Sequence, residues 1–324
     1  MVNLVFTKIA RFLYRILSKL INFCLPYISK FFIIIRINSR VVNQLNKLRA
    51  NSHHTNDHSN FILKLLGKNK LNALDIGAQG GFFGDSIFQK RYDTFFLPIV
   101  VEPIKSEAEK LINQNYQVIN KGLWSSNCKK KLYILENRSG SSSMYKPNKD
   151  NYGLYNLKEK DFSLFNVTSE IEVECTTIKE SLNSLSVVHL DFLKIDTQGS
   201  ELEILKGLGE YRPLVVKIEV QVVPMYKDVP SWTELLYHLC KINYMTCEWI
   251  NISPHSTRSP VEMDMIFIPN YLEEIGEKLI LSREKEFISL MLVFGQIKLL
   301  QVISKKLKFS TNADIQKLKD KFFY

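Results

Sequence analysis

The sequence of 324 residues contains few cysteines, and their spacing suits neither a zinc site nor a disulfide framework. Their number is odd, and no two of them have the Cys-x-x-Cys spacing that zinc sites and redox motifs use. We therefore predict reduced thiols, as in the cytosol, and not a scaffold held by disulfides. The five are Cys24, Cys128, Cys175, Cys240 and Cys247.

Acidic residues are absent from the first 56 positions. This segment carries nine lysines and arginines, whereas the whole chain has 43 basic and 33 acidic residues and a formal charge of +10. Almost all of the excess charge therefore belongs to one segment, and the remaining chain is close to neutral. A protein body that binds nucleic acid is not supported, because its basic residues would be spread over that body.

The sequence also has no apolar run of the ~20 residues that a membrane-spanning helix requires. The most apolar stretch, Leu20–Ile35, is interrupted by Asn22, Pro26 and Lys30. A cleavable secretory signal is also disfavoured, because basic residues recur through this stretch. We predict at most an attachment to the membrane surface.

Residues 1–40 have the pattern of a helix with a basic face. Lys8, Arg11, Arg15 and Lys19 recur at spacings of three and four, and apolar side chains fill most positions between them. Such a helix suits an anionic membrane surface on the cytoplasmic side. An organellar targeting segment, or a helix that packs on its own protein or a partner, are the alternatives.

The polar stretch Asn51–Asn60 predicts a linker and a domain boundary. We expect a basic segment and linker over residues 1–60, a main domain over 61–270 and a helical tail over 271–324. The tail has three candidate roles, which are covering the sheet edge, dimerisation and a second membrane contact. The linker histidines, His53, His54 and His58, are read as incidental and not as metal ligands.

Within the main domain, short apolar strands alternate with segments of helical length. This pattern predicts an α/β domain with a mostly parallel sheet and helices on both faces. Helices are expected near Lys105–Asn113 and Ser200–Leu208. The expected strands are 73–76, 98–101, 117–119, 131–135, 171–175, 192–195, 214–220 and 264–268. The segment Arg138–Asn166 is rich in turn formers and tyrosines, and we interpret it as a substrate-binding loop.

A glycine turn follows the first strand, but it lacks the Gly-x-Gly-x-x-Gly spacing that supports a pyrophosphate. S-adenosylmethionine needs a close backbone turn, an acid after the second strand for the ribose hydroxyls, and polar groups after the third strand for adenine. All three occur in this order. The predicted cofactor-binding residues are Asp75, Gly77, Ala78 and Gly80 at the turn, Glu102 after the second strand and Asn120 after the third.

Two further carboxylates are candidates for chemistry. Asp196 ends a buried strand and precedes a turn with Gly199, so it is expected at the same sheet edge as Gly77. Glu219 is embedded in the next apolar strand, where an acid is costly unless it is satisfied or functional. Lys194 should share a face with Asp196 and tune it or pair with it. The alternative is that these acids serve only as helix caps or in ion pairs.

The blocks LDIGAQGG, VVEP, SGSSSM, LKIDTQGSELEILKG, VVKIEVQ and DMIFIP together resemble the FkbM-type family of S-adenosylmethionine-dependent methyltransferases. The resemblance covers about residues 61–270, and the LKIDTQGSELEILKG block is its most specific part. Gln79 stands where such proteins more often have asparagine. The resemblance implies the Rossmann-like class I methyltransferase fold with a seven-stranded sheet. It also implies methylation of an oxygen on a sugar or secondary metabolite.

The leading hypothesis is therefore an O-methyltransferase that uses S-adenosylmethionine, with Asp196, Glu219 and Lys194 as catalytic residues. The acceptor is expected to be a small molecule or a glycan, in particular a sugar hydroxyl of a glycan, glycolipid or secondary metabolite. Two rivals are a nicotinamide-dependent oxidoreductase and a membrane-attached binding module without turnover. No metal site is predicted, although Asp196 and Glu219 together suit a divalent cation. The sequence does not determine an oligomeric state.

Overall fold

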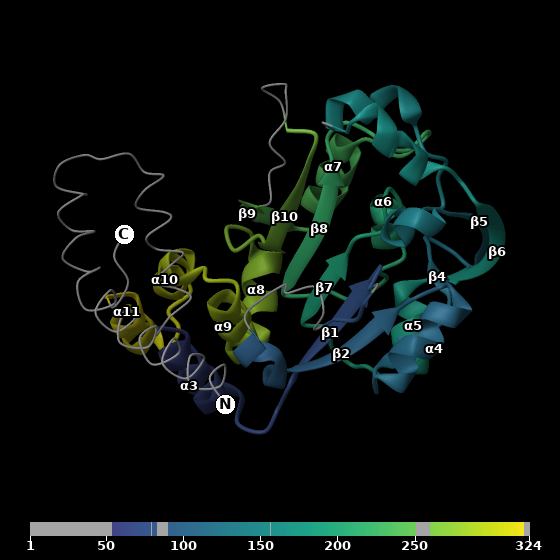
Figure 1. Cartoon of the computed structure of the whole chain (residues 1–324). Coiled ribbons are helices and arrows are strands. Elements are labelled where there is room, and N and C mark those ends of the chain that lie inside the picture. Colours follow the sequence, from purple (N-terminus) through teal and green to yellow (C-terminus); the bar gives the residue numbers. More distant parts are fainter. Residues whose placement is uncertain (1–53, 79, 83–89, 156, 251–259, 321–324) are drawn as a thin grey trace, which may run out of the picture. The chain divides into compact units, whose positions relative to one another are not determined.

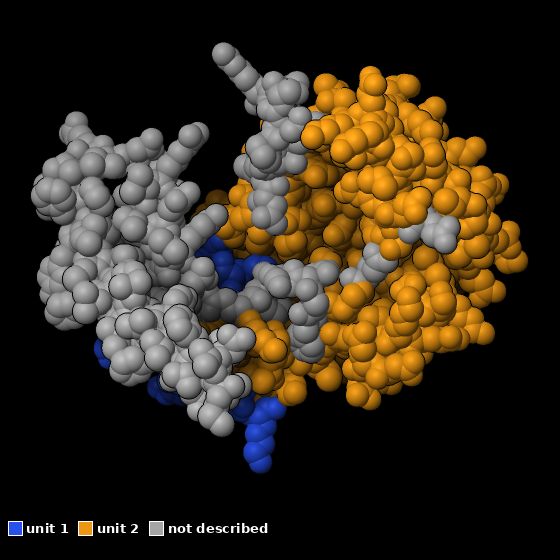
Figure 2. Space-filling model, in the orientation of Figure 1, with its two compact units in different colours: residues 1–68, 291–324 blue, residues 69–290 orange. Residues whose placement is uncertain are grey.

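A computed structural model describes residues 54–320, apart from 79, 83–89, 156 and 251–259. The basic segment 1–40 and Gln79 lie outside the described residues, so the predictions made for them stay predictions. The chain divides into two compact units (Figure 2). Unit 1 (blue in Figure 2) combines residues 1–68 with 291–324, and the larger unit 2 (orange) consists of residues 69–290.

The larger unit is built on a seven-stranded sheet with the strand order β3-β2-β1-β7-β8-β10-β9 (Figure 1). Strand β10 runs antiparallel to both of its neighbours, and the other pairings are parallel. The strands are β1 (Leu71–Ile76), β2 (Phe96–Val101), β3 (Gln117–Ile119), β7 (Phe192–Ile195), β8 (Val215–Gln221), β9 (Tyr244–Ile250) and β10 (Glu262–Pro269). The predicted seven-stranded, mostly parallel sheet is confirmed, and six of its strands lie within two residues of their expected ends.

A second, three-stranded sheet corrects one part of the prediction. Strands β5 (Cys128–Ile134) and β6 (Ser169–Thr176) were expected in the parallel sheet, but they pair antiparallel beside the short strand β4 (Gly122–Leu123). The reason is visible in their alternation of charge. Lys129 and Lys131 form ion pairs across the strands with Glu172 and Glu170, at 2.8 and 2.9 Å. Such half-exposed strands suit a sheet with one solvated face.

One face of the large sheet forms the main hydrophobic core. Because successive side chains of a strand point to opposite faces, alternate residues such as Leu74, Ile76, Leu193 and Ile195 share this side. They pack against buried residues of α5 (Ile178–Ser184), α6 (Glu201–Lys206) and α7 (Trp232–Lys241). Helix α4 (Lys105–Asn113), at its expected position, contributes buried Ala108 and Leu111.

The opposite face carries a buried row of charged side chains. Asp75 of β1 lies directly across from Lys194 of β7, and their charged atoms are 3.2 Å apart. Lys217 of β8 and Asp264 of β10 form a second pair at 2.9 Å. Removing one partner of such a pair would leave a buried charge without its counter-charge. The pairs therefore stabilise the observed register of these strands.

The tail after β10 is helical, as the sequence predicts. Helix α8 (Glu274–Ser282) contacts β10 and lies on the other side of the sheet from α6 (Figure 1). It is followed by α9 (Glu284–Val293). In unit 1, α10 (Ile297–Lys306) packs on α11 (Asn312–Asp320).

The linker prediction is wrong from His54 onward, because helix α3 (His54–Leu66) occupies this stretch. Its polar N-terminal half precedes apolar residues, and Ile62 and Leu66 are buried. No helix in the part of the chain that the structure describes is long and apolar enough to cross a bilayer.

We expect Leu74→Ala in the main core to lower the free energy of unfolding by about 2–5 kcal/mol, because it removes buried methyl groups and leaves a cavity. Leu97→Ala on the neighbouring strand is the matched control, since Leu97 is 52% exposed and Leu74 is fully buried. The control should change stability by less than about 0.5 kcal/mol. Equal effects in urea denaturation would contradict this account of the core.

Candidate active site

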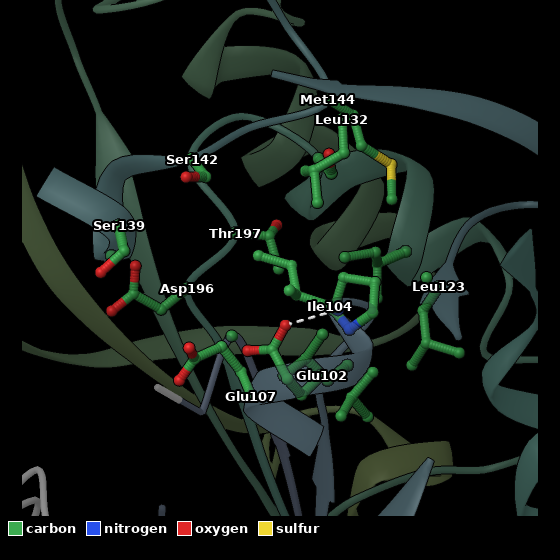
Figure 3. A pocket seen from close by; sticks show the side chains of 18 residues that line it. Glu102, Ile104, Glu107, Leu123, Leu132, Ser139, Ser142, Met144, Asp196 and Thr197 are labelled. Atoms are coloured by element: carbon green, nitrogen blue, oxygen red, sulfur yellow. Dashed lines mark hydrogen bonds between the residues drawn. The ribbon is translucent and has the colours of Figure 1, made fainter. Parts of the chain in front are cut away.

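A pocket of about 700 Å³ lies at the carboxyl ends of β1, β2 and β7 (Figure 3). It brings together Gly77, Glu102 and Asp196, three of the residues that the sequence singles out. The carboxyl ends of parallel strands are where open α/β sheets bind their ligands, so this pocket is the candidate cofactor site. Apolar side chains form the rest of its wall, among them Ile104, Leu123 and Met144.

The glycine turn is required by a close backbone contact. Gly77 has a φ of +85°, and a Cβ atom at this position would lie 1.8 Å from the carbonyl oxygen of Asp196. The backbone N–H of Asp196 also donates to the carbonyl of Ile76 at 3.0 Å. The end of β1 therefore touches the end of β7, and only glycine permits this approach.

Glu102 lies at the end of β2 and lines the pocket, where it is almost completely buried. One carboxylate oxygen accepts a hydrogen bond from the N–H of Ile104 at 2.8 Å (Figure 3). Burial raises the pKa of Glu102 to about 7, against the lowering effect of this N–H, and the nearby carboxylate of Glu107 adds to the rise. Hydroxyl donors that approach Glu102 would therefore favour the loss of its carboxyl proton.

The other predicted cofactor residues lie around the pocket and do not form its described wall. The side chain of Asn120 donates to the carbonyl oxygen of Glu102 at 2.8 Å, so it holds the end of β2. Ala78 is buried in the turn, and its carbonyl accepts from Gly81. Gly80 has a φ of +89°.

Lys194 and Asp75 are placed differently from the sequence interpretation. Lys194 was expected to tune or pair with Asp196, but its ammonium group lies beside Asp75 in the buried row of charges. The expectation followed from alternation along a strand, which stops applying where β7 ends at Ile195. Asp196 begins the turn, and its carboxylate accepts from Gln198 instead.

Described residues of the predicted loop Arg138–Asn166 form short helices and part of the pocket wall. The helices are η2 (Glu136–Ser141), η3 (Lys149–Tyr155) and η4 (Glu159–Phe165). Tyr152 and Phe165 of these helices share a small core with Tyr226, which follows β8. Four loop residues line the pocket, namely Ser139, Gly140, Ser142 and Met144.

Asp196 and Glu219 are joined by a side chain that the sequence reasoning did not identify. Gln198 donates through Nε2 to Oδ1 of Asp196 at 3.1 Å and to Oε2 of Glu219 at 2.5 Å. Burial raises the pKa of Glu219 well above its usual value, and neighbouring carboxylates, first that of Asp196, add to the rise. Glu219 also lines a second hollow of about 340 Å³, beside Gln221 and Trp232.

Glu201 is another residue that sequence reasoning missed. Its buried carboxylate accepts from the backbone N–H groups of Thr197 and Gly199 and from the Thr197 hydroxyl, at 3.0 to 3.1 Å. Burial nevertheless raises its pKa. Glu201 therefore shapes the turn that carries Asp196. The sequence feature that could have identified Glu201 is the block DTQGSE, in which polar residues directly follow a buried strand.

Among the described residues, no group of three or more histidines, cysteines, aspartates or glutamates is arranged to hold a metal ion. His58 is one of the linker histidines, and it is buried in α3. The four described cysteines are free thiols. A divalent cation at Asp196 and Glu219 stays an open alternative.

Residues 75–245 match the methyltransferase FkbM domain family, and the matched region is more than half of the chain. The region contains the glycine turn, Glu102, Asp196 and Glu219. The chain belongs to this family. It is a methyltransferase whose cofactor is S-adenosylmethionine, built on the class I methyltransferase fold, and the nicotinamide alternative is set aside.

The structure is similar to several solved structures at low identity. One is a methyltransferase FkbM from Methylobacillus flagellatus KT, with 16% identity, a TM-score of 0.33 and coverage of 60% of this chain. The match spans 43% of the length of that protein.

A second is the 1,6-didemethyltoxoflavin-N1-methyltransferase of Burkholderia thailandensis with bound S-adenosylhomocysteine, at 10% identity and a TM-score of 0.31, which covers 75% of this chain and 87% of that one. TrmK of M. capricolum, in complex with S-adenosylhomocysteine, has 13% identity and a TM-score of 0.31, with 81% and 93% covered. No curated protein matches the chain.

The pocket fits this cofactor on structural grounds. The turn at Gly77 brings bare backbone to the pocket, which suits the amino-acid end of S-adenosylmethionine. The second carboxylate oxygen of Glu102 accepts no hydrogen bond from the described residues and is available to ribose hydroxyls. Apolar Ile104 and Leu123 give a surface for the adenine ring.

We expect Glu102→Gln to weaken the binding of S-adenosylmethionine about tenfold or more, because hydrogen bonds to a charged acceptor are worth about 1.5–3 kcal/mol. Since the pKa of Glu102 is about 7, wild-type affinity should rise with pH through this value, and that rise should disappear in the variant. Calorimetry from pH 5.5 to 8.5 measures both effects. Glu109→Gln, exposed on the same helix as Glu107, is the control. An unchanged pH dependence in Glu102→Gln would remove Glu102 from the ribose site.

Proposed function

We propose that this methyltransferase transfers the methyl group to a hydroxyl oxygen of a sugar, carried by a glycan, a glycolipid or a secondary metabolite. The observation that carries the proposal is the bridge from Asp196, in the cofactor pocket, to Glu219, in the adjacent hollow. An acceptor hydroxyl that Glu219 holds at the edge of that hollow would be linked through Gln198 to Asp196 in the cofactor pocket.

The polar and aromatic groups around the second hollow support an acceptor rich in hydroxyl groups. Glu219 offers acceptor oxygens, Gln221 offers both a donor and an acceptor, and Trp232 offers a flat apolar surface. The FkbM-type resemblance points to the same class of acceptor.

When bound, S-adenosylmethionine supplies a methyl group on a sulfonium with a neutral leaving group. The protein's own task is to align the acceptor oxygen and to remove its proton. Alignment alone contributes several kcal/mol to lowering the barrier, and a positioned base contributes about 10²–10⁴-fold. Asp196 is the proposed base, because its carboxylate lines the cofactor pocket, and Glu219 holds the acceptor. We propose that Lys194, whose ammonium group is buried beside Asp75, supports β1 and β7 and does not contact the acceptor.

We expect Asp196→Asn to lower methyl transfer by about 10²–10⁴-fold while the affinity for S-adenosylmethionine stays within about threefold. The assay uses a labelled methyl group and a cell extract separated into lipids, glycans and small metabolites. Hydrolysis of the labelled fraction should release a methylated monosaccharide. Asp228→Asn is the control, because Asp228 is exposed and outside the pocket.

Label in protein or nucleic acid alone would overturn the sugar acceptor. Full activity in Asp196→Asn would remove Asp196 from the role of base.

We also propose that residues 1–40 attach the enzyme to the cytoplasmic face of a membrane, where a lipid-linked sugar would be available. The support is the recurrence of Lys8, Arg11, Arg15 and Lys19 in a segment without acidic residues. Each basic residue near an anionic surface adds about 1 kcal/mol to binding.

We expect the full-length variant K8E/R11E/R15E/K19E to bind anionic vesicles at least about 100-fold more weakly than the wild type, because four attractions become repulsions. Cosedimentation with vesicles of phosphatidylserine and phosphatidylcholine measures the effect. K305E/K306E/K308E, a change of similar size in the tail, is the matched control. Loss of binding only in the control would move the attachment to the tail.

A further inference from the structure

Gln198 has an unusual backbone conformation at the centre of the site. Its φ is +61°, in the left-handed region that side chains other than glycine, asparagine and aspartate rarely adopt. It is followed by Gly199, with a φ of +117°. The carbonyl oxygen of Gln198 accepts from the hydroxyl of Ser143 at 2.7 Å, so the pocket loop holds this turn in place.

Both N–H donors and the oxygen of the Gln198 amide have hydrogen-bond partners. Its two N–H donors meet one oxygen of Asp196 and one of Glu219. Its oxygen accepts from Nε2 of Gln221 at 3.2 Å, and the hydroxyl of Tyr226, which donates to the carbonyl of Ser141, lies 3.3 Å from it. Reversing the amide would point its oxygen at two carboxylates and its NH₂ group at the NH₂ group of Gln221, so the network determines the orientation.

The bridge connects the two hollows of the site. Asp196 lines the cofactor pocket, whereas Glu219 lines the adjacent hollow. A rigid amide between them sets the distance from the proposed base to the group that holds the acceptor. Catalysis by alignment depends on this kind of constraint, since small misplacements of reacting groups are costly.

We propose that Gln198 is a positioning residue for methyl transfer, which holds Asp196 and Glu219 side by side and keeps them available as proton acceptors. The inference rests on the proposed function.

The charges around Glu219 explain why a neutral amide with two N–H donors, that of Gln198, lies between the two carboxylates. Acidic groups approach Glu219 from two elements besides the Asp196 turn, α6 and β10, and Lys217, two residues before Glu219 on β8, is already paired with Asp264. An amide that donates to a carboxylate favours its charged form, so it opposes the rise in the pKa of Glu219. The groups around Glu219 are Asp196, Glu201 of α6, Glu262 and Asp264 of β10, Tyr155 of η3 and Tyr226, beyond which lies Arg138.

The test compares Gln198→Asn and Gln198→Glu in the full-length protein. Asparagine tolerates the left-handed conformation but is one methylene too short to bridge, whereas glutamate keeps the length and adds a third acid. We expect at least a tenfold loss of methyl transfer in both, with the affinity for S-adenosylmethionine within about threefold. The pH of half-maximal rate should rise in the order wild type, Gln198→Asn, Gln198→Glu, because a base must be ionised and each change disfavours ionisation.

A second measurement is independent of turnover. In protein labelled with ¹³C at the glutamate carboxyl carbons, the Glu219 signal is assigned by its loss in Glu219→Gln, and its titration gives the pKa directly. The pKa of Glu219 should be higher in both Gln198 variants than in the wild type. Asp228→Asn is the matched control, because Asp228 also has a φ of +61° and is exposed, and it should change neither readout.

Two results would overturn the role of Gln198. One is folded variants with wild-type rates, pH profiles and Glu219 titration. The other is a loss of cofactor affinity or of thermal stability in parallel with the rate, which would make Gln198 a structural residue only. If the wild type methylates no extract fraction, the proposed function fails, while an unchanged Glu219 titration in the variants rejects the bridge separately.

Discussion

The site depends on one close contact between the ends of two neighbouring parallel strands. The α-carbon of Gly77 lies against the carbonyl of Asp196. The backbone N–H of Asp196 donates a hydrogen bond to the carbonyl of Ile76. Just below, the buried pair of Asp75 and Lys194 holds the same two strands in register. Because the strands meet without a gap, the cofactor turn and the proposed base share one edge of the pocket.

Around this contact, the buried carboxylates accept hydrogen bonds from groups close to them in the structure. Glu102 is held by the Ile104 N–H, Glu201 by the N–H groups of its own turn, and Glu219 by Gln198. Each carboxylate keeps a raised pKa because burial outweighs these donors. A buried carboxylate with few hydrogen-bond donors gains stability when a ligand brings hydroxyl donors to it. Carboxylates with raised pKa values are therefore expected in a binding site.

The small sheet and the loop η2–η4 complete the pocket from outside the main sheet. Met144 and Ser142 line the cofactor pocket, while Phe165 packs in a small core with Tyr226, which follows β8. The exposed lysine–glutamate pairs of β5 and β6 are worth little individually, so this region depends on its apolar side. Loops on a packed scaffold are where binding residues are commonly found, which suits a region that recognises the acceptor.

The sequence alone determined the parallel sheet, its glycine turn and the order of Gly77, Glu102 and Asp196, because these depend on local periodicity and on strand ends that must meet at one edge. It did not separate β5 and β6 from the main sheet, place Lys194 with Asp75, or find Gln198. Those features depend on strand pairing and on contacts between segments far apart in the chain. Burial and hydrogen-bond partners exist only after packing, so only the tertiary structure decided which acids meet and which residue joins them.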